Sequence, residues 1–203
     1  MGVSAAAPVR QRTLDVDDLS ALLAYLRFAM KAEAVAIDSA QLLSGGAVQE
    51  NWRVQLQVTG GTFDGPQDVV LRTDAQARVP ISLDRSAEFR VLETAFAAGV
   101  AVAEPLLECR DATIIGAPFT LQRYCPGEAS ARSLTRSPDL DAWGDDAVFA
   151  LGRELATVHT IRPGAPSAER LSFLPVPLHA PGVVEVERLR GALKGSAEAR
   201  PAL

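Results

Sequence analysis

The stretch LLSGGAVQENWRV, residues 42–54, together with DVVLR, residues 68–72, decides the fold that we expect for this chain. From residue 52 onward, apolar side chains alternate with polar ones, which is typical of a half-buried antiparallel strand; the apolar positions are Trp52, Val54, Leu56 and Val58. A glycine-rich turn at residues 60–66 leads into a second short strand over 69–72, which ends on Arg72. The pattern predicts two paired strands, the second of which ends on a cation.

On either side of these strands, the sequence predicts further strands and several helices. A helix over 15–30 has Asp15 or Asp17 as its cap, and a helix over 83–98, capped by Ser82 or Asp84, stops at Gly99. The remaining predicted elements are strands over 100–109 and 113–124 and helices over 139–161 and 183–193. We therefore expect an α+β fold in which residues 35–125 form an antiparallel sheet of about five strands with helix 83–98 packed on it.

A second turn, which precedes strand 52–58 and follows the first strand of the expected sheet, is rich in small residues, and Ser44, Gly45 and Gly46 lie at its start. Glycines let backbone N–H groups approach phosphates that a side chain would keep away. Arg72 could then reach those phosphates, and Glu88, 88 − 72 = 16 residues later, could direct it. The alternatives are an ordinary hairpin turn and an exposed ion pair of little consequence.

Five segments, in this order, resemble the aminoglycoside phosphotransferase family: LLSGGAVQENWRV, DVVLR, SAEFRVLETAFAAGVAVAEPLLEC (86–109), IIGAPFTLQRYCPGE (114–128) and ELATVHTI (154–161). The branch they resemble most is that of the kinase-like domains fused to acyl-CoA dehydrogenases. The resemblance covers about residues 35–162. It implies a protein-kinase-like fold. It also implies an enzyme that transfers the γ-phosphoryl group of ATP, or of another nucleoside triphosphate, to a hydroxyl group of a small molecule.

The resemblance also implies roles for individual residues. The turn from Ser44 to Asn51 corresponds to the loop that covers the nucleotide, Arg72 to the phosphate-binding cation and Glu88 to the helix carboxylate. The segment Gln122, Arg123, Tyr124 and Cys125 matches the hinge, whose backbone groups would bind the adenine edge. Arg72 departs from the lysine of most kinases; the two lysines of this chain are Lys31 and Lys194.

The family's catalytic segment, a His-Gly-Asp motif with a following asparagine and a metal-binding aspartate, has no counterpart in this sequence. The last aspartate is Asp146, and neither His159 nor His179 is followed by Gly-Asp. We therefore expect no catalytic residue and no ligand for the Mg²⁺ that the family uses. The expected organisation is a leader and helix at 1–34, a nucleotide-binding lobe at 35–125, and a hinge with an incomplete helical lobe at 126–203.

Three functions stay open: a phosphotransferase present as an incomplete chain, a catalytically inactive nucleotide-binding or structural remnant, and an unrelated α+β interaction module. The formal net charge of −5 over 203 residues argues against nucleic-acid and anionic-membrane binding. No apolar run is long enough to span a membrane, and residues 1–12 have no signal-peptide pattern, so we expect a cytoplasmic protein. Uncovered apolar surface would favour self-association. We expect Cys125 to be a small buried side chain and His159 to be packed in a core.

Overall fold

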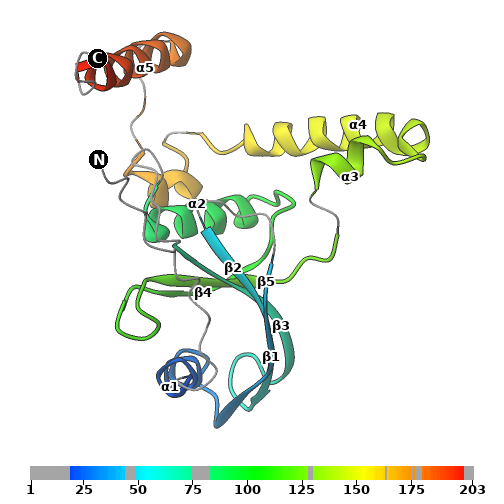
Figure 1. The fold of residues 1–203 in the computed structure, drawn as a ribbon, viewed down its shortest axis with the longest axis vertical. Coiled ribbons are helices and arrows are strands. Elements are labelled where there is room, and N and C mark those ends of the chain that lie inside the picture. The colour runs from blue at the N-terminus through cyan, green and yellow to red at the C-terminus, as the bar shows by residue number, and fades with distance from the viewer. Residues whose placement is uncertain are drawn as a thin grey trace, which may run out of the picture.

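A five-stranded sheet forms the centre of the computed structural model, which describes residues 19–43, 49–74, 83–127, 130–162, 164–174, 176 and 180–198 (Figure 1). Its strands are β1 (Ala34–Leu42), β2 (Gln49–Thr59), β3 (Gly65–Asp74), β4 (Pro105–Cys109) and β5 (Phe119–Arg123). They lie in the order β1-β2-β3-β5-β4, and every neighbouring pair is antiparallel. The predicted α+β fold with an antiparallel sheet is confirmed.

The strands differ in length from the sequence prediction. The alternating stretch 52–58 lies at the centre of β2, and β1, which completes the expected five strands although its bounds were not predicted, pairs with its outer edge. The last two strands are shorter than predicted. Strand β4 begins only at Pro105, and a turn over residues 112–117, with Gly116 at a φ of 83°, delays β5 until Phe119.

Helix α1 (Ser20–Ala29) packs on one face of the sheet and closes the hydrophobic core. Its Leu22 and Leu26, with Met30 just beyond, are buried against apolar side chains from four strands: Trp52, Val54, Leu56, Val58, Val69, Leu71, Cys109, Phe119 and Leu121. The helix was predicted from residue 15. In the structure it begins at Ser20 after Leu19, which provides no side-chain cap, and the proposed caps Asp15 and Asp17 lie outside the described residues.

Helix α2 (Arg85–Ala97) lies on the opposite face of the sheet from α1 (Figure 1). Asp84 caps it, as predicted, by accepting a hydrogen bond from the Ala87 N–H at 2.7 Å. The helix ends before Gly99, whose φ of 83° is the left-handed conformation expected just after a helix. The predicted helix 83–98 is therefore confirmed with slightly shorter ends.

In the described part of the chain, four further helices follow the sheet: α3 (Ala131–Thr135), α4 (Leu140–Val158), the 3₁₀ helix η2 (Pro166–Leu171) and α5 (Pro181–Glu198). Apolar side chains recur along the helix predicted over 139–161, but four of them on α4 are 41% to 69% exposed: Val148, Leu151, Leu155 and Val158. His159, predicted to be in a core, is exposed as well. The physical reason is that α4 and α5 extend away from the sheet (Figure 1). None of the helices in the described ranges is both long and apolar enough to cross a membrane.

Candidate functional site

Arg72 and Glu88 face each other between the sheet and helix α2, as the sequence predicted. Arg72 lies on β3, with Asn51 of β2 and Thr120 of β5 as its cross-strand neighbours. Glu88 is in the first turn of α2, and its Oε1 accepts a hydrogen bond from Nη2 of Arg72 at 2.7 Å. Both side chains are partly shielded, with exposed fractions of 22% for Arg72 and 32% for Glu88.

A second arginine completes this cluster, and sequence reasoning missed it. Nη1 of Arg85 donates to Oε2 of Glu88 at 2.8 Å, and Nη2 of Arg85 donates to Oδ1 of Asp74. Two elements thus supply two charged residues each: Arg72 and Asp74 come from the end of β3, and Arg85 and Glu88 come from the start of α2. The available signal was the spacing, because residues two apart on a strand and three apart on a helix share a face.

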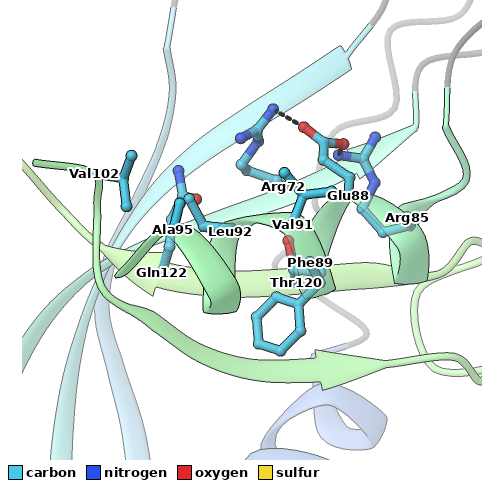
Figure 2. A pocket seen from close by; sticks show the side chains of 10 residues that line it. All are labelled: Arg72, Arg85, Glu88, Phe89, Val91, Leu92, Ala95, Val102, Thr120 and Gln122. Atoms are coloured by element: carbon cyan, nitrogen blue, oxygen red, sulfur yellow. Dashed lines mark hydrogen bonds and ion pairs between the residues drawn. The ribbon is translucent and has the colours of Figure 1, made fainter. Parts of the chain in front are cut away.

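A cavity of about 170 Å³ adjoins these charged groups (Figure 2). Arg72, Arg85 and Glu88 form its charged end, and Thr120 and Gln122 of β5 line it from the sheet; its apolar wall comes from Phe89, Val91, Leu92, Ala95 and Val102. Pockets that enclose a drug-sized ligand usually measure about 300–1,000 Å³. This cavity can therefore hold only part of a nucleotide-sized ligand, and the rest would lie against the open face of the sheet.

The residues predicted to be the hinge follow directly from β5. The side chain of Gln122 points into the cavity. The N–H groups of Arg123 and Tyr124 donate to the carbonyls of Glu104 and Asp68, at 2.8 and 3.0 Å, and so belong to the sheet. Tyr124 therefore cannot use its N–H for a nucleobase, whereas Cys125 comes after the last strand pairing.

Cys125 is exposed, which corrects the prediction of a small buried side chain. The reason is that β5 ends at Arg123, so the chain has already left the sheet at this position. The buried cysteine is Cys109, and its pKa is raised, chiefly because burial disfavours the thiolate. The predicted turn residues Ser44, Gly45 and Gly46 lie outside the described residues, so their role stays a prediction.

Next to the hinge, Arg53 forms a contact that the sequence did not indicate. Its Nε and Nη2 donate to the two carboxylate oxygens of Asp68 at 3.0 and 2.6 Å. Its guanidinium carbon lies 3.9 Å from the ring centroid of Tyr124. The hydrogen bonds to Asp68 raise the pKa of Arg53 above its ordinary value. Because Asp68 and Arg72 are an even number of residues apart on β3, this cluster shares a sheet face with Arg72.

Within the described part of the chain, no group of three or more His, Cys, Asp or Glu side chains is arranged to hold a metal ion. Asp74 and Glu88 are engaged by Arg85 and Arg72, and Oε2 of Glu154 on α4 accepts the Ala101 N–H at 2.8 Å. The described residues therefore do not fit a Mg²⁺ site.

The profile of the phosphotransferase enzyme family matches residues 39–193. No curated protein matches the chain. One similar solved structure is that of a Ralstonia eutropha JMP134 protein described as a "putative aminoglycoside phosphotransferase", with 23% identity and a TM-score of 0.49. The similarity covers 70% of this chain but only 37% of that one. The narrower resemblance to domains fused to acyl-CoA dehydrogenases stays a prediction.

Proposed function

This chain belongs to the phosphotransferase enzyme family, and on that premise we propose that it provides the nucleoside triphosphate site for phosphoryl transfer to a hydroxyl group of a small molecule. ATP is the expected nucleotide. The observation that carries the proposal is the 2.7 Å ion pair between Arg72 and Glu88, beside the cavity on the α2 face of the sheet. When bound, the nucleotide would supply the γ-phosphoryl group.

Arg72 is suited to binding phosphate while it remains paired with Glu88. A guanidinium is charged at all relevant pH values and presents several N–H donors in one plane. It can therefore bind a carboxylate with one edge and phosphate oxygens with another. The carboxylate of Glu88 fixes the direction in which the guanidinium points, the role that the equivalent acidic residue has in kinase active sites.

The base of the nucleotide is expected next to the hinge. The N–H groups of Arg123 and Tyr124 are engaged in the sheet, so the Arg123 carbonyl and the Cys125 N–H are the groups we assign to the base edge. This refines the sequence prediction, which assigned the role to the whole segment 122–125. The identity of the acceptor hydroxyl, the predicted cytoplasmic location and the division into lobes at residues 35–125 and 126–203 stay predictions.

A second candidate function is nucleotide binding without phosphoryl transfer. Two observations favour it for the chain as given: the sequence has no His-Gly-Asp motif, and the described residues offer no cluster of three or more potential metal ligands. For this reason, no residue of the chain is assigned a role in phosphoryl transfer that depends on Mg²⁺. Activity of the whole protein is a separate proposal, since the chain spans only 37% of the length of the solved structure that it resembles.

The proposal is tested by thermal unfolding of the purified chain with ATP, GTP and no nucleotide. Binding to the folded state at 100 times the Kd would stabilise the chain by about 2.7 kcal/mol and raise its Tm. We expect this rise for the unaltered chain and not for Arg72→Ala. Arg188→Ala is the matched control, because Arg188 also pairs with a glutamate, Glu185, but on α5. No rise with either nucleotide would contradict the proposal and favour an interaction module.

A further inference from the structure

Arg85 is the only charged residue that is buried among those the structure describes; 5% of its surface is exposed. It is the first residue of α2, and its guanidinium spans two carboxylates, Glu88 on its own helix and Asp74 at the end of β3. Figure 2 shows the Arg85 and Arg72 guanidinium groups on either side of Glu88. Glu88 thus binds one arginine with each carboxylate oxygen.

Charged contacts are a large part of what holds the start of α2 to the sheet. Apart from Arg85, the helix buries only Phe89 and Thr94 among its described side chains. A carboxylate that is bonded to two fixed cations has little freedom to change rotamer. Arg85 therefore restrains Glu88 from the side opposite Arg72, and its contact with Asp74 ties that restraint to the strand that carries Arg72.

We propose that Arg85 is a positioning residue that fixes Glu88, and through Glu88 holds the guanidinium of Arg72 ready for phosphate before nucleotide binds. This inference rests on the proposed function, because it assigns Arg72 to the phosphates. It differs from the behaviour of kinase-like folds in which the position of this helix is a switch. In this chain the extra link from Arg85 to Asp74 would keep the helix in place.

The first arm of the test measures hydrogen exchange of residues 85–97 without nucleotide. Arg85→Gln removes both contacts of the guanidinium, and Asp74→Asn removes only the charge at the far end. Glu93→Gln is the matched control, because Glu93 lies on the same helix but pairs with Arg170 of η2 at 3.6 Å. We expect faster exchange in the first two variants and unchanged exchange in the control. Exchange in Arg85→Gln equal to that of the unaltered chain would overturn the proposal.

The second arm separates positioning of Arg72 from a general structural role. The affinities of ATP and adenosine are compared, since adenosine has the base but no phosphate. We expect Arg85→Gln to weaken ATP binding about tenfold and to leave adenosine binding unchanged. A tenfold loss of affinity corresponds to a variant in which only about a tenth of the molecules hold Arg72 in the position that binds phosphate. In an Arg72→Ala background, Arg85→Gln should have no further effect on ATP binding. Equal losses for ATP and adenosine would overturn the positioning role.

The two proposals can fail separately. If the unaltered chain binds neither ATP nor adenosine, the proposed function fails, and the exchange arm still decides whether Arg85 fixes α2. Circular dichroism verifies that each variant is folded. If Arg85→Gln does not fold, Asp74→Asn carries both arms, because Asp74 is 34% exposed at the end of β3 and its change to Asn keeps the side-chain volume.

Discussion

The guanidinium of Arg72 and the carboxylate of Glu88 lie 2.7 Å apart, although the two residues are 16 positions apart in the sequence and belong to different elements. Strand β3 brings Arg72 to the α2 face, and the Asp84 cap sets where α2 begins, one turn before Glu88. The contact therefore depends on where a strand ends and a helix starts. Because of this contact, two residues that are distant in the sequence form one charged site.

The first prediction concerns the type of cation at position 72. Arg72→Lys should keep nucleotide binding within a few fold, because the ammonium is also a phosphate ligand, whereas Arg72→Ala should weaken it by about 10- to 100-fold, the equivalent of about 1.5–3 kcal/mol for hydrogen bonds to a charged group. Titration calorimetry with ATP measures both. Binding by Arg72→Ala as tight as by the unaltered chain would show that Arg72 is not a phosphate ligand.

The core beneath the site should be sensitive to loss of volume. Phe119 on β5 is fully buried between α1 and the sheet, where its ring meets Tyr25 edge-on at 5.5 Å between centroids. Phe119→Ala should destabilise the fold by about 3–5 kcal/mol through the lost burial and the cavity left behind. Phe28→Ala is the control: Phe28 is 83% exposed and should change stability by less than about 0.5 kcal/mol. Urea unfolding that gave similar midpoints for both variants would contradict this account.

The central strands and α2 could be predicted from the sequence because their signals are local. Strand β2 alternates apolar and polar side chains, and α2 is bounded by Asp84 and Gly99. The bounds of β1 could not be predicted because it lies at the edge of the sheet and mixes small and polar residues in AVAIDSAQL, so that its pattern of burial is weak. The starts of β4 at Pro105 and of β5 at Phe119 were placed too early, because the apolar residues before them continue the pattern of a strand.

The site itself could be predicted only in part. Arg72 and Glu88 were identified from their order along the chain, but Arg85 was not, because its contact with Asp74 depends on how α2 is placed over the end of β3. The exposure of Cys125 and His159 was also missed. For both residues the local sequence fits a packed side chain, and the tertiary structure leaves them at the surface.

Two glycines of the β2–β3 hairpin, Gly61 in its turn and Gly65 at the first position of β3, should respond differently to alanine. A Cβ on Gly61, which has a φ of +79°, would lie 2.5 Å from the carbonyl oxygens of Met30 and Lys31. Gly65, with a φ of +96°, has no atom within 4 Å of such a Cβ. Gly65→Ala should cost about 1–2 kcal/mol for the left-handed backbone, and Gly61→Ala about 1–3 kcal/mol more for the overlap. Equal urea midpoints for the two variants would argue against the close approach.

The Tyr25 hydroxyl should lose its proton only at a pH well above that of an exposed tyrosine. Its hydroxyl donates to the Glu108 carbonyl at 2.7 Å, and burial, with the nearby Cys109, raises the pKa of Tyr25 to about 12. Because this folded-state pKa lies above the ordinary tyrosine value of 10.0, the stability that the buried hydroxyl contributes is present below pH 10 and is lost as the pH rises toward 12. The absorbance titration of the unaltered chain minus that of Tyr25→Phe should show a late tyrosinate step. A difference step near pH 10 would contradict the raised pKa.

Our last prediction is that the 203-residue chain binds nucleotide but does not transfer its phosphoryl group. Phosphoryl transfer needs metal ions held against the phosphates and a carboxylate that orients the attacking hydroxyl. After Asp146 the only acidic residues in the sequence are Glu154, Glu169, Glu185, Glu187 and Glu198. Glu154 is engaged by the Ala101 N–H, and the others come from η2 and α5, of which α5 lies away from the sheet.

The test is incubation of the chain with ATP, Mg²⁺ and a panel of hydroxylated small molecules, with product detected by mass spectrometry. Binding must be measured in parallel, so that an inactive chain is distinguished from one that never bound nucleotide. We expect ATP binding and no product above the rate of a reaction without protein. Product that forms with the unaltered chain and disappears in Arg72→Ala would show that acidic groups other than a His-Gly-Asp segment support the reaction, and the inactive assignment would be wrong.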